Sequence, residues 1–283
     1  TSIWAGRWFV SLKGGISVEC IRKIVVSGSP YERGRQQGEF LKPLIHENIN
    51  NIIDSLSSSV LDIGRYREIT VRNAEFLKNR CPEQWEEMEG IAKGADASFD
   101  DILTINIPSY FMKDTFAEDC SMLLARSGST LDGLTYLIKN RDMEMMEHQA
   151  AIEYLYPDGK TVLEVNGAGI ITYPAIGLNN NGLAVTSTGF WSPKTEIDME
   201  DIDCCHIFVN IHHLLEKCSC TGDVLEMLKT YPRMNGLNMI AADRQGAVLI
   251  ETTKDGYLCR WADESGILFR TNHYCLGEHV YQN

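Results

Sequence analysis

The sequence predicts an α+β fold in which helices come first and antiparallel strands follow. Hydrophobic residues at helical spacing dominate the chain up to about residue 119. Beyond that point short β-prone runs alternate with turn dipeptides, and a helical stretch from about residue 202 to 230 interrupts them. Because hairpin sheets need a covering layer, we expect helices to pack over them.

The first predicted helix spans about residues 31–56 and gathers its apolar residues on one face, namely Leu41, Ile45, Ile49, Ile52 and Leu56. Pro43 is expected to kink this helix or to mark a first turn. Further helices are predicted at about 65–79, 82–93 and 98–105. Pro82 suits a helix start, and Ser98 is a candidate N-cap.

The β-prone runs lie at residues 121–126, 134–139, 161–165, 169–174, 183–190, 237–242, 247–252, 257–261 and 267–271. The turn dipeptides between them are Asp132-Gly133, Asp158-Gly159, Asn181-Gly182, Gln245-Gly246 and Asp255-Gly256. This order predicts antiparallel hairpins with two helices inserted between about 202 and 230. The chain has no internal repeat and no low-complexity linker.

Composition narrows the class of protein. With 44% hydrophobic and 23% charged residues and no apolar run of roughly 18 residues, neither disorder nor a membrane span is expected. The net charge of -13 disfavours a nucleic-acid partner. The 9 cysteines lack the spacing of a disulfide framework, and residues 1–10 show no continuous apolar signal region. We therefore expect reduced thiols and a cytoplasmic location.

Cys120 stands where the helical pattern changes to strands. It follows Asp119, and the block Lys139-Asn140-Arg141-Asp142 comes on the next β-prone run. Cleavage of the bond before Cys120 would turn this residue into an N-terminal nucleophile.

Several segments, in order, carry a resemblance to a known family: PYERGRQQGE, EDCSMLLAR with the following NRD, GLNNNGLAV, GLNMIAADRQGAVLIE and RTNHYC. Together they resemble the peptidase C45 family, named for acyl-coenzyme A:6-aminopenicillanic acid acyltransferase. Its wider relatives are the N-terminal nucleophile hydrolases, including bile-salt hydrolases and acid ceramidase-type amidases. The resemblance covers most of residues 30–275 and implies a four-layer αββα sandwich of antiparallel sheets.

The same resemblance implies a self-processing enzyme. Cleavage between Asp119 and Cys120 would separate a helical fragment, residues 1–119, from a β-rich catalytic fragment, residues 120–283, within one structural domain. Its substrate would be a small acyl-amide or acyl-thioester, with no cofactor and no metal. Relatives continue past RTNHYC, so we expect this chain to be truncated at its C-terminus. The oligomeric state and the acyl acceptor stay open.

The site residues are carried over from the family pattern. Cys120 is the expected nucleophile, and its own α-amino group, with a pKa of roughly 7.7–8.0, is the expected base. Asp142 is expected to hold this amino group, and Asn140, on the same strand face, to support it. Asn238 matches the family's oxyanion-hole asparagine.

Three further residues are candidates for substrate binding. Lys139 stands where bile-salt relatives carry an arginine, and a lysine does not reproduce a bidentate fork. Phe190 and Trp191 lie near strand ends that would frame the nucleophile, where Tyr173 also lies. These aromatic residues serve equally well in a core.

Other functions remain open. The chain is alternatively an uncleaved, inactive scaffold of the same fold that acts as a binding protein. A papain-like peptidase is less favoured, because the CGSCW signature is missing. The cysteines and histidines between residues 204 and 220 fit no zinc-ligand spacing, and little after Thr1 supports that residue as an alternative nucleophile.

Overall fold

A computed structural model of the protein describes residues 21–58, 63–107, 118–143, 148–189, 210–231, 236–253 and 256–276. The helices are α1 (Pro30–Ser58), α2 (Ile63–Arg80), α3 (Pro82–Ala95), α4 (Phe99–Asn106), α5 (Ile211–Lys217) and α6 (Thr221–Thr230). The strands are β1 (Arg22–Ser27), β2 (Glu118–Ala125), β3 (Tyr136–Met143), β4 (Gln149–Leu155), β5 (Thr161–Gly167), β6 (Ile176–Asn179), β7 (Ala184–Thr188), β8 (Asn238–Ala242), β9 (Ala247–Thr252), β10 (Tyr257–Trp261) and β11 (Ile267–Arg270).

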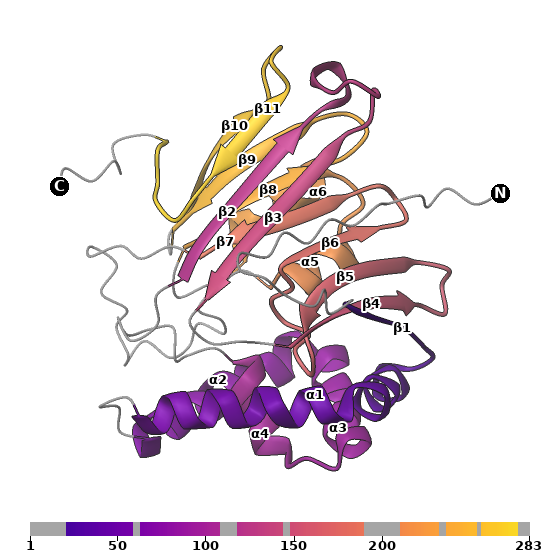
Figure 1. The fold of residues 1–283 in the computed structure, drawn as a ribbon, viewed down its shortest axis with the longest axis vertical. Coiled ribbons are helices and arrows are strands. Elements are labelled where there is room, and N and C mark those ends of the chain that lie inside the picture. Colours follow the sequence, from indigo (N-terminus) through magenta and orange to yellow (C-terminus); the bar gives the residue numbers. More distant parts are fainter. Residues whose placement is uncertain are drawn as a thin grey trace, which may run out of the picture.

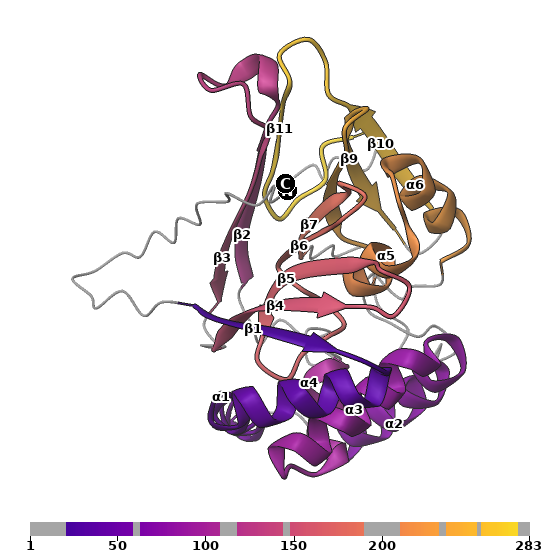
Figure 2. The same ribbon diagram turned by 90° about the vertical axis from the view of Figure 1, so that its right-hand side faces the viewer.

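The architecture is α+β, as predicted, with two sheets that face one another (Figure 1). The larger sheet has the order β1-β4-β5-β6-β7-β8-β9-β10, and the smaller one has the order β11-β2-β3. Figure 2 shows the smaller sheet on one side of the larger sheet and helices α5 and α6 on the other. Helices α1–α4 form a bundle at the β1–β4 end.

Two hydrophobic cores follow from the alternation of side chains along β8 and β9. Met239, Ala241, Val248 and Ile250 belong to the core shared with the helices. The residues that alternate with them pack between the two sheets; they are Ile240, Ala242, Ala247 and Leu249. There they contact Met122, Leu124 and Leu268 of the smaller sheet. A polar residue on this second face of β8 or β9 therefore points toward the smaller sheet.

The predicted helices are confirmed. Ser98 is the N-cap of α4 and accepts a hydrogen bond from the Asp101 backbone N–H at 3.1 Å. Helix α1 continues through Pro43, so the prediction that this proline marks a first turn is wrong. Packing along α1 offsets the backbone hydrogen bond that the proline lacks. None of the described helices has an apolar stretch long enough to cross a bilayer.

Helices α1 and α3 cross in direct backbone contact, which glycines allow. A Cβ on Gly34 would overlap the backbone carbonyl of Glu87, and one on Gly90 would overlap that of Tyr31. A Cβ on Gly38 or Gly94, one turn further along each helix, would also overlap a backbone carbonyl of the other helix. The glycines of the PYERGRQQGE segment thus serve helix packing.

Most predicted strands are confirmed, but residues 169–174 do not form one. This apolar run is a buried loop held by Asn106: the Ile171 N–H donates to Asn106 Oδ1 at 2.8 Å, and Thr172 Oγ1 donates to the Asn106 carbonyl at 2.7 Å. Strands β1 and β4 were not predicted. Strand β1 pairs in parallel with β4, far along the chain, which a search for sequential hairpins does not detect.

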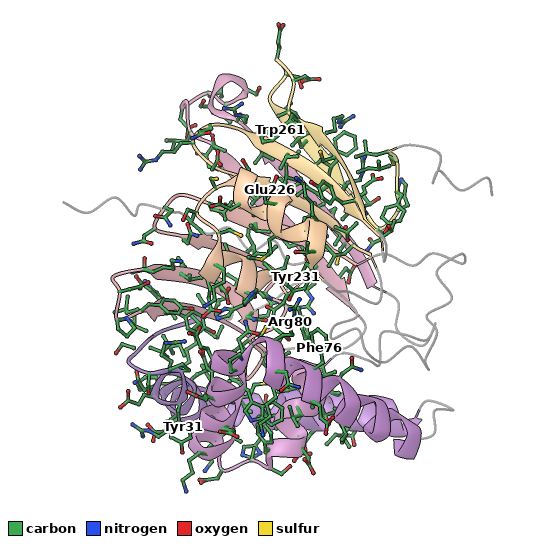
Figure 3. The ribbon with its side chains drawn as sticks, turned by 180° about the vertical axis from the view of Figure 1, so that it is seen from behind. Tyr31, Phe76, Arg80, Glu226, Tyr231 and Trp261 are labelled. Atoms are coloured by element: carbon green, nitrogen blue, oxygen red, sulfur yellow. The ribbon has the colours of Figure 1, made fainter. Side chains whose placement is uncertain are left out.

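A buried polar cluster joins the helical bundle to the rest of the fold. Arg33 Nη2 lies 2.9 Å from Glu87 Oε2 and 3.9 Å from Glu216 Oε1. Glu216 Oε1 also accepts a hydrogen bond from the Tyr156 hydroxyl at 2.9 Å, and His212 Nδ1 lies 2.9 Å from Glu164. Figure 3 shows the molecule from behind, with Arg80 near the end of α2 and Tyr231 after α6. The cluster connects residues on both sides of position 119.

Candidate active site

Cys120 is the third residue of β2, and its side chain is 5% exposed. Its neighbours on the same strand face, Met122 and Leu124, are buried between the sheets. The thiol therefore belongs to the inner face of the smaller sheet.

Asn272 contacts the backbone of Cys120 from a segment 152 residues away in sequence. The Cys120 N–H donates to Asn272 Oδ1 at 2.7 Å. Asn272 Nδ2 in turn donates to the Gly189 carbonyl at 2.8 Å, which orients the side-chain amide. The nitrogen of the Asp119–Cys120 peptide bond is thus held by a side chain. Sequence reasoning did not assign this residue a role, although the RTNHYC segment that contains it was recognised.

The four residues of the 139–142 block divide between the two faces of β3. Arg141 is directly opposite Cys120, so its side chain shares the inner face, as does that of Lys139. Lys139 Nζ donates to the Ser187 carbonyl at 2.5 Å, and the Arg141 guanidinium lies 6.0 Å from the centre of the Tyr173 ring. Two cations therefore lie on the same side of the sheet as the Cys120 side chain.

Asn140 and Asp142 occupy the other face of β3 and are exposed. The backbone of Asp142 is opposite Asp119, one position from the Cys120 nitrogen. Asp142 is therefore close to the Cys120 nitrogen across the β2–β3 strand pair, but its side chain does not share the face of the Cys120 side chain. Asn140 lies opposite Ser121 on that same outer face.

Asn238 is fully buried, and both its amide hydrogens are engaged. Its Nδ2 donates to the carbonyls of Thr271, at 2.9 Å, and His273, at 3.2 Å. These two residues flank Asn272, so Asn238 holds the segment that contacts Cys120. Thr188 Oγ1 adds a third hydrogen bond to this segment, at 2.8 Å from the Thr271 carbonyl.

Some predicted positions lie outside the described residues. These are Phe190 and Trp191, which follow Gly189, and the Cys204-Cys205-His206 run. The backbone of Asp119 is described within β2, whereas its side chain is not.

Two other buried thiols, those of Cys81 and Cys218, differ from an activated nucleophile. Burial raises the pKa of Cys81 to about 11 and that of Cys218 to about 12. His213, 3.9 Å from the Cys81 sulfur, has its pKa lowered by burial. Among the described residues no group of three or more histidine, cysteine or acidic side chains is placed to hold a metal ion.

The arrangement suits attack by the Cys120 sulfur on a neighbouring carbonyl. The sulfur is shielded from solvent, the nitrogen of its own peptide bond has a fixed hydrogen-bond acceptor, and two cations occupy the same side of the sheet. Such a site can form and release an acyl group on sulfur.

Comparison with known proteins gives a family match, and the similar solved structures include an acylase and a hydrolase. A sequence profile described as acyl-coenzyme A:6-aminopenicillanic acid acyl-transferase matches residues 129–282. Penicillin V acylase from Agrobacterium tumefaciens is 11% identical with a TM-score of 0.29, over 53% of this chain and 43% of that chain. A variant of conjugated bile acid hydrolase from Clostridium perfringens is 16% identical with a TM-score of 0.26, over 56% and 46%. The chain thus spans less than half the length of either protein.

Proposed function

Since the chain belongs to the acyl-coenzyme A:6-aminopenicillanic acid acyl-transferase family, we propose that it is a self-processing cysteine amidohydrolase or acyltransferase. Cys120 is the nucleophile, and an acyl-Cys120 thioester is the intermediate. The observation that carries this proposal is the hydrogen bond from the Cys120 N–H to Asn272, because it holds the nitrogen that must leave in the first step.

Self-cleavage proceeds in two steps. The Cys120 sulfur attacks the Asp119 carbonyl carbon, the carbon–nitrogen bond breaks, and the thiol proton passes to the released amine. Water then hydrolyses the Asp119 thioester, which leaves a carboxylic acid on Asp119 and a free thiol on Cys120. Asn272 Oδ1 keeps the nitrogen in place during both steps.

After cleavage the α-amino group of Cys120 acts as the base for its own thiol. Its ordinary pKa of roughly 7.7–8.0 allows it to take a proton near neutral pH. Asn272 accepts a hydrogen bond from this amine, and Asp142, next to the new chain end, favours its charged form once it has accepted the proton. The substrate is a small acyl-amide or acyl-thioester, and Lys139, Phe190 and Trp191 are assigned to its binding. The Cys120 sulfur attacks the acyl carbon of the substrate, the carbon–nitrogen or carbon–sulfur bond breaks, and the amine or thiol leaves with the proton from the α-amino group. The acyl group then passes from Cys120 to water or to an amine, which restores the free thiol.

A cytoplasmic location is part of this proposal, and cysteine chemistry supports it. The described cysteines, Cys81, Cys120, Cys218, Cys220, Cys259 and Cys275, are all free. Free thiols persist in a reducing compartment, so we assign the enzyme to the cytoplasm.

Denaturing mass spectrometry tests the proposal. Wild-type protein is expected to separate into residues 1–119 and 120–283, while Cys120→Ala stays intact. Cys259→Ala, which removes an exposed thiol on β10, is the matched control and should cleave like the wild type. An electrophilic acyl probe should label Cys120 after cleavage. Wild-type protein that stays whole after long incubation would contradict self-processing.

A further inference from the structure

We propose that Glu251 is a positioning residue that fixes residues 271–276, the Asn272 loop, so that Asn272 meets the Cys120 nitrogen. The inference deepens the proposed function and rests on it for the chemistry at Cys120. It assigns a role to a buried carboxylate that takes no part in the steps above.

Glu251 binds both ends of the Asn272 loop. Its Oε1 accepts hydrogen bonds at 2.8 Å from Arg270 Nε, just before the loop, and from the Cys275 N–H near its end. Its Oε2 accepts one from the Leu276 N–H, also at 2.8 Å. A single carboxylate thereby sets the distance between the two ends of the loop.

The placement of Glu251 follows from strand register. It lies on β9 directly opposite Asn238 on β8, and residues paired in this way point to the same face. This is the face that meets the smaller sheet. Asn238 binds the Thr271 and His273 carbonyls on either side of Asn272, while Glu251 binds the two ends.

The burial of Glu251 supports a positioning role, because its carboxylate must be paired inside the protein. Its side chain is 3% exposed, and a buried carboxylate is tolerated only when its oxygens are paired. Arg270, itself 6% exposed, supplies the charge, and the two backbone N–H groups complete the pairing. A neutral residue would fill the space but would not satisfy a guanidinium and two N–H groups together.

The first experiment measures the hydrogen bond that Glu251 is proposed to position, without needing any reaction. In the Cys120→Ala background, which leaves the backbone N–H at position 120, hydrogen exchange of that amide is followed by NMR. Glu251→Gln is expected to accelerate exchange there roughly tenfold, as Asn272→Ala does, because one hydrogen bond is lost. Combining both changes should add nothing further.

The second experiment follows the rate of Asp119–Cys120 cleavage. Glu251→Gln should slow it by about 100-fold, since a small misplacement of a reacting group costs that much. If Glu251 acts through Asn272, the Glu251→Gln/Asn272→Ala double variant should cleave at the rate of Asn272→Ala alone. Glu251→Asp, which keeps the charge but shortens the side chain, should fall between wild type and Glu251→Gln.

Asp243→Asn is the matched control. Asp243 also holds a turn through backbone N–H groups, those of Gln245 and Gly246, but at the far end of the β8–β9 hairpin. It should leave both the position-120 exchange rate and the cleavage rate unchanged.

The outcomes separate the two proposals. The role of Glu251 would be overturned if Glu251→Gln left the exchange rate at position 120 unchanged. It would also be overturned if the effects of Glu251→Gln and Asn272→Ala on the exchange or cleavage rate multiplied in the double variant. If Glu251→Gln fails to fold, the same readouts on Glu251→Asp decide. Wild-type protein that never cleaves would overturn self-processing, while the exchange experiment still tests whether Glu251 positions Asn272.

Discussion

Asn272 can bridge Cys120 and Gly189 because its side-chain amide has an acceptor at one end and a donor at the other. Oδ1 accepts from the Cys120 N–H, and Nδ2 donates to the Gly189 carbonyl. The two bonds together exclude the flipped orientation, in which an N–H would face the Cys120 N–H and Oδ1 would face a carbonyl. A single side chain thus connects β2 to the end of β7.

Titration of Glu87 should make the free energy of unfolding depend on pH. Burial is the main cause that raises its pKa from 4.5 to about 7, and it outweighs the nearby Arg33 charge. A carboxyl with a raised pKa in the folded state gives stability that is complete below pH 4.5 and lost as pH rises to about 7.

We therefore expect Glu87→Gln to gain stability relative to wild type as pH rises from about 4.5 to 7, because a neutral amide cannot ionise. Urea unfolding across this range measures the difference. Glu83→Gln, on the same helix but exposed and paired with Lys217, is the control and should show a smaller change. A pH-independent difference between Glu87→Gln and wild type would argue against this titration.

At the scale of elements, the α1–α3 crossing depends on its glycines. We expect Gly90→Ala to lower the free energy of unfolding by about 1–3 kcal/mol, because the new methyl group would push against the Tyr31 carbonyl and separate the helices. Chemical denaturation measures this loss.

Gly128→Ala is the matched control, since no atom lies within 4 Å of its would-be Cβ. It should be close to neutral. Equal stability of Gly90→Ala and Gly128→Ala would show that the two helices can move apart without cost.

At the scale of the whole molecule, contacts across position 119 should keep the fragments together after cleavage. Arg33 and Glu87 come from the first fragment, and Glu216 comes from the second. Gln84 and Asn210 add hydrogen bonds across the same junction, and β1 pairs with β4. We expect the wild-type fragments to co-elute in size-exclusion chromatography.

Arg33→Gln should weaken this association, because it removes the cation that lies between Glu87 of the first fragment and Glu216 of the second. Loss of one partner of a buried ion pair typically costs about 3–5 kcal/mol. Native mass spectrometry on dilution should then detect the fragment of residues 1–119 alone. Arg35→Gln, which removes an exposed arginine paired with Glu39, should not release it. If both variants released the fragment of residues 1–119 equally, Arg33 would not be what holds the two fragments together.

The sequence by itself determined most of the helices and strands, together with the expectation that Cys120 is the nucleophile. Helical spacing located α1–α4, and alternating runs with turn dipeptides located most strands, because these signals are local. Motif order led to the family and to Cys120. The apolar run at 169–174 was misassigned, because a short buried loop and a buried strand have the same composition.

Only the tertiary structure decided which polar residues surround Cys120. Asn238, predicted as an oxyanion donor, binds the backbone around Asn272, and Asn272 makes the contact with Cys120. The structure also placed Lys139 and Arg141, rather than Asn140 and Asp142, on the face of the Cys120 side chain. These outcomes depend on strand register and on packing between segments far apart in the chain, which local sequence patterns do not encode.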